Sequence, residues 1–316
     1  MKRFFGKNRK IIILSLASIV GIICLYQVIF SYDWQNIGQA LLKANFFILF
    51  CSSVISIISY WFFRAVRWKI LLSNEQLEIS FSRIYLITAV SVGFSTITPF
   101  QSGEALKVEF LKRYGAGRFS GYGIFLLERL QDLLVVVGLG IFGVAVNFNL
   151  QLIQNYLYFF AAGLLLGILI ITTAILWLPF SLLQPFREWF KEIRQSKYIF
   201  LPSLLLTFLS WMAVVSGWHF ALKSVEVEIE FISSMTIVSL TTLVTIISFV
   251  PGAIGVSELT ISGILIKLGT PEALAQTGAI AVRLYSLVIL VLTLIHWLIL
   301  SFMTKNKWLS MKRLPN

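Results

Sequence analysis

TPFQSGE at residues 98–104 and VPGAIGVSE at residues 250–258 interrupt long apolar runs and decide the fold of this chain. Each stretch ends on a glutamate, and an arginine follows 25 residues later, pairing Glu104 with Arg129 (129 − 104) and Glu258 with Arg283 (283 − 258). A charged side chain at the centre of a membrane costs about 2.5–3.5 kcal/mol, so such residues mark pathways and binding sites. The same arrangement in both halves indicates a duplication around one central site.

Composition places the chain in a membrane. Its 316 residues are 58% hydrophobic and only 13% charged, whereas soluble domains carry about 25% charged residues. Several windows hold roughly 20 apolar residues, enough to cross a hydrocarbon core of about 30 Å. The net charge of +12 lies in short segments that flank apolar runs, where lipid phosphates explain it, so we expect no nucleic-acid partner. The prediction is an all-α, multi-pass integral membrane protein.

The apolar runs predict six full spans and two re-entrant helical hairpins. The spans are expected at 11–30 (an uncleaved first span), 46–63, 120–147, 156–178, 199–222 and 276–301. Residues 84–98 and 254–268 are too short to span at about 15 residues, and each adjoins a Pro/Gly break. Broken segments are tolerated at membrane depth where they are buried or line a watery cavity. We therefore expect hairpins at 84–114 and 231–268, although 231–250 alone is long enough to span.

The distribution of Lys and Arg sets the expected orientation. Basic residues concentrate in alternate connections, at 1–10, 64–83, 106–118, 179–198 and 302–316. The remaining connections, 31–45, 147–155, 223–230 and 269–275, are poor in Lys and Arg. Under the positive-inside rule both termini are cytoplasmic, in a bacterial-type inner membrane.

Each half of the single membrane domain, 1–316, then holds three spans and one hairpin. Because three is odd, residues 156–301 insert upside down relative to residues 11–147, which is the inverted repeat of many secondary transporters. At an offset of 154 the informative matches are Glu104 with Glu258, Gly115 with Gly269, and Arg129 with Arg283.

The hairpin tips are expected to meet near the midplane of the membrane. Residues that permit a sharp reversal or begin a helix are Pro99, Ser102 and Gly103 in the first tip, and Pro251, Gly252, Gly255 and Ser257 in the second. Ser102 and Ser257 can cap the following helices, and a glutamate suits a helix N-terminus, so Glu104 and Glu258 have a purely structural reading. The same helix starts attract phosphate.

The charged residues near the breaks allow two interpretations. One is an internal ion network that joins helices, since Glu128, Arg129 and Asp132 share a helix face. The other is a polar cavity in which Arg129 and Arg283 meet a lipid phosphate, because the planar guanidinium binds phosphate bidentately. The second interpretation predicts a substrate-binding set of Glu104, Lys107, Glu128, Arg129, Asp132, Glu258 and Arg283.

No catalytic or metal centre is predicted. Nucleotide-binding, nucleophile-elbow and zinc-protease motifs are absent from the sequence, which argues against an ATP-driven pump. His219 and His296 each stand alone among apolar residues, and Cys24 and Cys51 fit small buried hydrophobes. We therefore expect no cofactor and no bound metal.

The motifs, in their order, resemble a known family. P-x-x-x-G-E-x-x-K at 99–107, E-R-x-x-D at 128–132, P-G-x-x-G-V-x-E at 251–258 and an intramembrane Arg283 resemble the lysylphosphatidylglycerol synthase transmembrane-region family. These flippase-like proteins also form the N-terminal module of multiple-peptide-resistance proteins. The resemblance covers roughly residues 10–300. Lys107 stands where the family commonly has Arg, and Gln101 where a basic or small residue is frequent, which bears on headgroup choice more than on fold.

The resemblance implies a flippase or transporter that moves a lipid between leaflets. The cargo would be a phospholipid with a charged or polar headgroup, such as aminoacylated phosphatidylglycerol, or a lipid-linked precursor. Bifunctional relatives add a soluble aminoacyltransferase domain; about 15 residues follow the last expected span, so we expect none here. Two alternatives stay open: a phosphatidylglycerol lysyltransferase-type enzyme with Glu104 or Glu258 as general base, and a scaffold for a lipid-modifying partner enzyme. A homo-oligomer also stays open.

Overall fold

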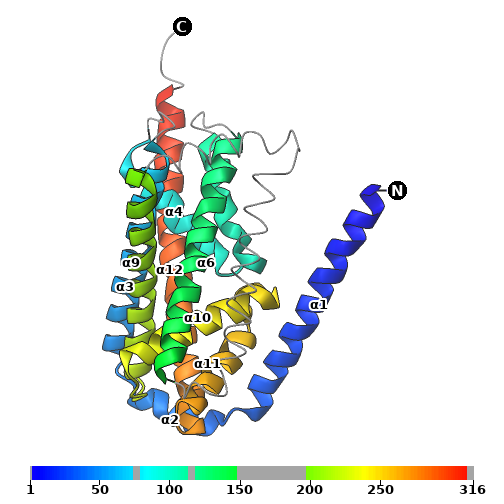
Figure 1. Ribbon diagram of the computed structural model, residues 1–316, viewed down its shortest axis with the longest axis vertical. Coiled ribbons are helices and arrows are strands. Elements are labelled where there is room, and N and C mark those ends of the chain that lie inside the picture. Colours follow the sequence, from blue (N-terminus) through cyan, green and yellow to red (C-terminus); the bar gives the residue numbers. More distant parts are fainter. Residues whose placement is uncertain (1, 74–78, 113–117, 148–196, 312–316) are drawn as a thin grey trace.

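The computed structural model describes residues 2–73, 79–112, 118–147 and 197–311, and every regular element within these ranges is a helix. The predicted all-α class is therefore confirmed. Four long helices run side by side along the longest axis of the molecule (Figure 1). They are α3 (Phe46–Leu71), α6 (Arg118–Asn147), α9 (Lys197–Lys223) and α12 (Glu272–Met311). The predicted span at 156–178 lies outside the described residues.

Within the described ranges, five helices are long and apolar enough to cross a membrane. The number rises to six if α1 (Lys2–Ser31) and α2 (Trp34–Lys43), which meet at a 78° bend, form one broken span. The predicted span at 11–30 qualifies only through this pair. Conversely, α10 (Phe231–Ser248), predicted as one arm of a hairpin, qualifies on its own. The protein is a multi-pass membrane protein, while the count of six spans stays a prediction.

Local sequence signals explain where several helices begin and end. The side chains of Asp33 and Asn45 accept hydrogen bonds from the backbone N–H groups of Asn36 and Ile48, at 3.1 and 3.0 Å, and so cap α2 and α3. Phe249 adopts a left-handed conformation that ends α10 just before Pro251. In contrast, α3 continues to Leu71, eight residues beyond the predicted end at residue 63 (71 − 63).

Both predicted breaks form short 3-10 turns between helices. The first is η2 (Pro99–Ala105), between α4 (Phe81–Ser95) and α5 (Leu106–Lys112). The second is η4 (Pro251–Ala253), between α10 and α11 (Val256–Lys267). The two turns contact each other. The predicted tips therefore lie together, although they come from opposite halves of the sequence.

The two halves share one pattern of neighbours. The first helix of each hairpin packs on the long helix of the other half, α4 on α12 and α10 on α6. The second helix of each hairpin packs on the long helix that follows it, α5 on α6 and α11 on α12, and α3 packs along α9. An inverted repeat would produce this pattern; the repeat and its bounds, 11–147 and 156–301, stay predictions.

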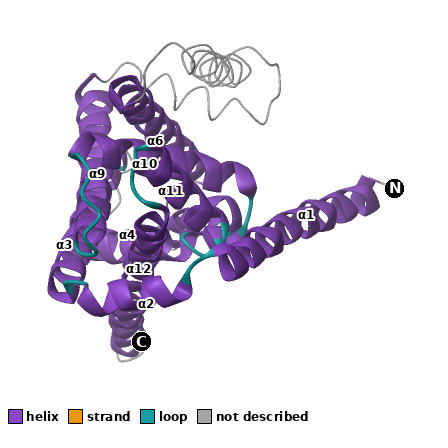
Figure 2. Cartoon of the chain, turned by 90° about the horizontal axis from the view of Figure 1, so that it is seen from below, coloured by secondary structure: helices purple, strands orange, loops and turns teal. Residues whose placement is uncertain are grey.

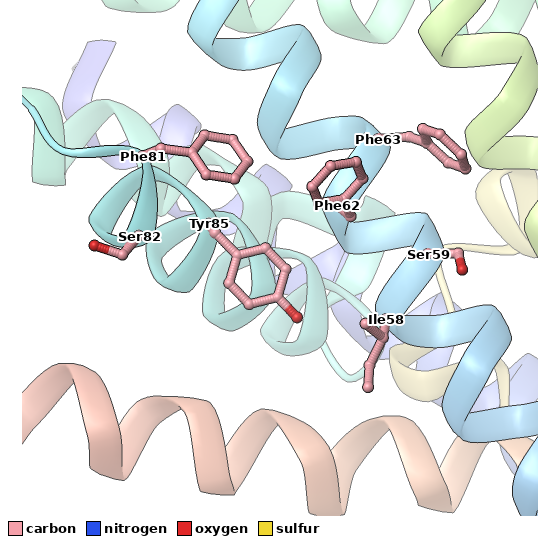
Figure 3. A pocket seen from close by; sticks show the side chains of 7 residues that line it. All are labelled: Ile58, Ser59, Phe62, Phe63, Phe81, Ser82 and Tyr85. Atoms are coloured by element: carbon pink, nitrogen blue, oxygen red, sulfur yellow. The ribbon is translucent and has the colours of Figure 1, made fainter.

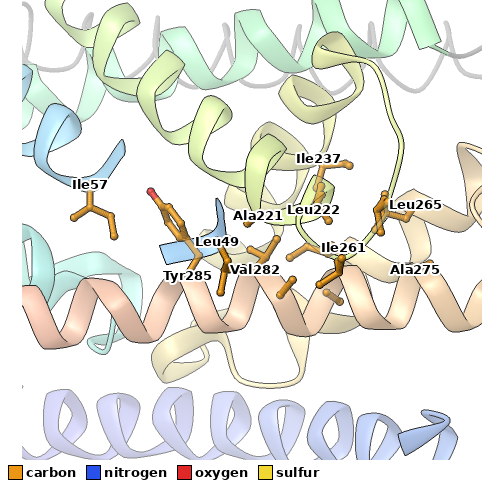
Figure 4. Packing of buried hydrophobic residues seen from close by; sticks show 14 of the residues in the cluster. Leu49, Ile57, Ala221, Leu222, Ile237, Ile261, Leu265, Ala275, Val282 and Tyr285 are labelled. Carbon is orange, nitrogen blue, oxygen red and sulfur yellow. The ribbon is translucent and has the colours of Figure 1, made fainter. Parts of the chain in front are cut away.

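The main apolar core joins residues of α3, α9, α11 and α12 (Figure 4). Leu49 and Ile57 from α3 pack there with Leu222 from α9 and Val282 from α12. Polar contacts fix the same junction, because Ser56 Oγ donates to the carbonyl of Ala213 at 2.7 Å and contacts Tyr285 Oη at 3.0 Å. Helix α1 extends away from this bundle and meets α11 and η4 near its C-terminal end (Figures 1 and 2).

Gly255 holds the second tip against α1, and replacing it by alanine should destabilise the protein. Its φ is +80°, and a Cβ there would overlap the backbone of Cys24 and Leu25. We expect Gly255→Ala to cost about 1–3 kcal/mol through overpacking. Thermal unfolding in detergent measures the change. Gly263→Ala in the same helix, where a Cβ meets nothing within 4 Å, is the control; equal midpoints for both variants would contradict the expectation.

Candidate functional site

The first tip buries Glu104 against the long helices. Gly103 makes the turn tight, because a Cβ there would press on the backbone of Phe94 and Ser95 at the end of α4. The N–H of Gly103 donates to Thr98 Oγ1 at 2.8 Å, which holds the loop closed. The Glu104 side chain that follows is 1% exposed, so it needs buried partners.

Three cations surround that carboxylate. Glu104 Oε2 accepts hydrogen bonds from Arg64 Nη2 and from Arg129 Nη2, each at 2.7 Å. Lys107 Nζ, one turn further along, lies 3.4 Å from the same oxygen. The predicted pair of Glu104 with Arg129 therefore exists, as part of a larger cluster.

Two acidic residues of α6 extend the cluster. Asp132 accepts from Arg64 Nη2 at 3.0 Å, from Arg67 Nη1 at 2.8 Å and from Arg129 Nη2. Glu128 accepts from Arg67 Nη2 at 2.9 Å, and Lys107 Nζ lies 3.3 Å away. We call the seven residues the ion network: Arg64, Arg67, Glu104, Lys107, Glu128, Arg129 and Asp132.

The ion network carries an unbalanced charge. With four cations and three carboxylates its formal charge is +1 (4 − 3). Removing one partner from a buried pair typically costs 3–5 kcal/mol, because the other charge is left uncompensated. Arg129 is its outermost member, with 24% of the side chain exposed.

Arg64 and Arg67 were not among the predicted site residues. The prediction placed them in a cytoplasmic connection, but α3 continues past both and buries them completely. A signal was present in the spacing, since Trp61, Arg64, Trp68 and Leu71 recur at three- and four-residue intervals and form one buried face. The basic residues within 64–83 favour a cytoplasmic connection instead, so the sequence carries two conflicting signals here.

The second tip holds a simpler arrangement. Arg283 donates from Nε to Glu258 Oε1, and from Nη1 to the carbonyl of Gly252 at 3.0 Å. Ser257 Oγ donates to Glu258 Oε2 at 2.9 Å. Each glutamate thus pairs with the arginine of its own half, a question that the sequence left open.

Neither predicted serine cap forms. The N-cap of α11 is Gly255, and Ser257 lies inside the first turn, where its one hydroxyl proton is shared between the carbonyl of Ala253 at 3.0 Å and Glu258 Oε2. The first tip begins at Thr98 without a side-chain cap, and Ser102 is exposed. The serines therefore do not account for the helix starts, although Glu258 does lie in the first turn of α11.

A cavity of about 600 Å³ lies between the two tips and the long helices. Its apolar wall comes mainly from α3, α9 and α12, including Trp61, Trp211 and Leu290. Its polar wall includes Gln101 from the first tip and Glu258 and Arg283 at the second. An amphipathic cavity of this kind suits a molecule with a polar head and an apolar body.

The predicted site residues therefore divide into two groups. Glu258 and Arg283 line the cavity together with Gly252, Gly255 and Ser257. The five predicted residues of the first half belong to the ion network and are not part of the cavity lining: Glu104, Lys107, Glu128, Arg129 and Asp132. Gln101 connects the two groups, because its Oε1 accepts from Arg129 Nη1 at 3.4 Å.

A second hollow of about 460 Å³ lies between α3 and α4 (Figure 3). Four of its seven lining residues are aromatic, namely Phe62, Phe63, Phe81 and Tyr85, and none is charged. It offers nothing to a charged headgroup. The cavity between the tips is the candidate site.

The two histidines and two cysteines lie outside the ion network and outside the cavity lining. His219 Nδ1 contacts Ser234 Oγ at 3.0 Å, and His296 Nε2 contacts Tyr85 Oη at 3.2 Å. Cys24 and Cys51 are free cysteines. Among the residues that the structure describes, no group of three or more His, Cys, Asp or Glu side chains is arranged to hold a metal ion.

Comparison with known proteins finds a matching family model and a similar membrane protein. The family model described as the lysylphosphatidylglycerol synthase TM region matches residues 12–293, which confirms the predicted resemblance. The chain is also 24% identical over 278 residues to a UPF0104 membrane protein of Pyrococcus horikoshii, a match that covers 76% of this chain and 81% of that protein.

Proposed function

The chain belongs to the lysylphosphatidylglycerol synthase TM region family, and from that premise we propose that it moves a phospholipid or lipid-linked precursor between membrane leaflets. The observation that carries the proposal is the Glu258–Arg283 pair, which lines the cavity between the two tips. A charged pair at such a position is costly unless it serves a ligand or a pathway. The cargo would be a lipid with a charged or polar headgroup.

Arg283 would hold the lipid phosphate. Glu258 and Gly252 occupy its Nε and Nη1, whereas Nη2 has no hydrogen-bond partner in the described part of the chain. The side chain is 26% exposed, so these remaining N–H groups can reach a ligand in the cavity. Charge-assisted hydrogen bonds from a guanidinium to phosphate are strong and directional.

Glu258 would orient Arg283. Its two carboxylate oxygens accept from Arg283 and Ser257, which fixes the guanidinium plane relative to the cavity. The aromatic wall, with Trp61, Trp211 and Trp218, would accommodate the apolar part of the lipid. The headgroup and the upper acyl chains would thus occupy opposite walls of one cavity.

Movement between leaflets would follow from alternating access between the two repeats, with the tips as the moving gate. The contact between η2 and η4 supports this role, because it joins the two halves next to the cavity. We place the protein in a bacterial-type inner membrane with cytoplasmic termini, as the charge distribution favours.

The transferase alternative fits the geometry less well. A general base must accept a proton, and cations beside a carboxylate stabilise its charged form and make it a weaker base. Glu104 faces Arg64, Arg129 and Lys107, and Glu258 faces Arg283 and Ser257. Both carboxylates are arranged to hold cations and donors.

The test is transbilayer movement in vesicles that contain the purified protein. Fluorescent phospholipids with anionic, zwitterionic and aminoacylated headgroups are incorporated, and bleaching of the outer leaflet by dithionite reports exchange. We expect at least one headgroup to move faster than in protein-free vesicles. Exchange at the protein-free rate for all of them would refute the proposal.

Glu258→Gln should slow that exchange by about tenfold, because a neutral amide holds Arg283 less firmly than a carboxylate does. The substitution keeps the volume of the side chain and hence the packing of α11. The initial rate of dithionite-detected exchange is the measurement. Glu272→Gln, at the exposed start of α12, removes the same charge away from the cavity and should leave the rate unchanged; equal rates in the two variants would argue against a role for Glu258.

A further inference from the structure

Besides the Glu258–Arg283 pair, the cavity lining presents neutral hydrogen-bond donors with a surplus positive charge behind them. Tyr60 and Gln101 both line the cavity. Each accepts a hydrogen bond from a different arginine of the ion network. These hydrogen bonds from the ion network determine whether Tyr60 and Gln101 present donors or acceptors to a ligand in the cavity.

The contact with Arg64 leaves the hydroxyl of Tyr60 as a hydrogen-bond donor for a ligand. Arg64 Nη1 donates to Tyr60 Oη at 2.8 Å, so the phenolic oxygen is already an acceptor there and its own proton is available for another partner. Tyr60 Oη has no second hydrogen-bond partner among the residues that the structure describes. A ligand oxygen in the cavity would provide one.

The contact with Arg129 likewise leaves Gln101 as a hydrogen-bond donor for a ligand. Arg129 Nη1 donates to its Oε1 at 3.4 Å, which leaves the amide N–H₂ group for the cavity, and this group has no partner in the described ranges. Gln101 also adopts a φ of +52°, a conformation that costs of order 1–3 kcal/mol for a residue with a side chain. Such strain persists at ligand-binding sites more often than elsewhere.

The two donors belong to one patch. The arginines behind them share a single acceptor, because Arg64 Nη2 and Arg129 Nη2 both donate to Glu104 Oε2 at 2.7 Å. Trp211 extends the patch, since its ring centre lies 6.2 Å from that of Tyr60. Its buried indole N–H has no hydrogen-bond partner among the described residues.

The formal charges around the cavity predict the sign of the net charge on the ligand. The ion network contributes +1 (4 − 3), and the Glu258–Arg283 pair contributes zero (1 − 1). These are the charged residues that the structure places in or directly behind the cavity wall within the described ranges. A ligand of charge −1 would neutralise the assembly, whereas a ligand of charge +1 would raise it to +2.

We propose that the cavity selects a monoanionic glycerophospholipid, with Tyr60 and Gln101 donating to oxygens of its headgroup, over zwitterionic lipids and over lipids made cationic by aminoacylation. This inference rests on the proposed function, because it names the class of lipid that the same cavity takes. The selection is electrostatic and comes from the surplus charge of the ion network, whose members do not line the cavity.

Equilibrium binding tests the inference separately from transport. Purified protein in a non-ionic detergent is titrated calorimetrically with dihexanoyl forms of phosphatidylglycerol, phosphatidylcholine and lysyl-phosphatidylglycerol. One charge acting over about 7 Å of protein changes affinity by tenfold or more, so we expect phosphatidylglycerol to bind at least about tenfold more tightly than the other two.

Two substitutions should remove that preference by different routes. Gln101→Glu adds a negative charge at the cavity wall, and Lys107→Met removes a positive one from a buried residue that does not line the cavity. Each takes the formal charge from +1 to zero, and each should weaken phosphatidylglycerol binding by about tenfold. Gln39→Glu, on the exposed surface of α2, makes the same charge change elsewhere and should leave binding unchanged.

The outcomes separate the two claims. The inference is supported if phosphatidylglycerol binds most tightly and if both Gln101→Glu and Lys107→Met abolish that preference. This holds even if no lipid crosses the vesicle bilayer and the proposed function fails. Equal or tighter binding of lysyl-phosphatidylglycerol overturns the inference and leaves transport intact. An unchanged preference in both variants, or no binding of any of the three lipids, overturns it as well.

Discussion

Asp132→Asn is expected to destabilise the protein by about 3–5 kcal/mol, the cost of breaking a buried ion pair by removing one partner. Asp132 accepts from three arginines, Arg64, Arg67 and Arg129. The amide keeps the shape of the side chain but adds two N–H donors that face those guanidinium groups. The midpoint of thermal unfolding in detergent, followed by size-exclusion chromatography, measures the loss.

Two comparisons make that prediction specific. Glu228→Gln removes an exposed carboxylate and should change stability by less than about 0.5 kcal/mol. Adding Arg67→Met to Asp132→Asn should recover part of the loss, because the formal charge of the ion network then returns from +2 (4 − 2) to +1 (3 − 2). Equal midpoints for Asp132→Asn and Glu228→Gln would show that the ion network does not hold α3 and α6 together.

Arg283→Ala is expected to abolish lipid exchange while the protein stays folded. Losing a charged partner of a bound phosphate costs about 2–5 kcal/mol, which corresponds to a loss of about 30-fold or more. The fold should survive with a lowered unfolding midpoint, because Arg283 is 26% exposed whereas its buried partner Glu258 loses its cation. Dithionite-detected exchange in vesicles gives the activity, and the unfolding midpoint gives the stability.

The matched variants are Arg283→Lys and Lys267→Ala. Lysine keeps the charge without the planar fork, so exchange should recover only in part. Lys267 lies on α11 with an exposed side chain, and its loss should leave exchange unchanged. Exchange at the wild-type rate in Arg283→Ala would remove Arg283 from the proposed pathway.

The breaks and the charge pairs could be predicted from the sequence because their signals are local. Pro251 and its neighbouring glycines interrupt an apolar run, and a buried Glu258 25 residues before Arg283 requires an explanation wherever it occurs. The duplication inferred from the sequence predicts that the two tips meet. The contact between η2 and η4 agrees with that prediction. The span at 156–178 lies outside the described residues and stays a prediction.

The different roles of the two halves could not be predicted in this way. Arg64 and Arg67 resemble the basic end of a span, and only the folded arrangement, in which their side chains reach Glu128 and Asp132 of α6, shows that they pair with acidic residues. The same arrangement draws Glu104 and Arg129 into the ion network and leaves Glu258 and Arg283 on the cavity wall. Equal spacing in sequence specified matching positions, whereas the ion pairs formed by Arg64 and Arg67, which have no counterpart in the spacing, distinguish the surroundings of the two Glu–Arg pairs.

A structure of the protein in nanodiscs that contain phosphatidylglycerol tests the central claim most directly. We predict density for one lipid in the cavity between the two tips, with its phosphate within hydrogen-bond distance of Arg283 Nη2. A cavity without lipid density, while ordered lipids occupy the outer surface of the same particles, would contradict the account.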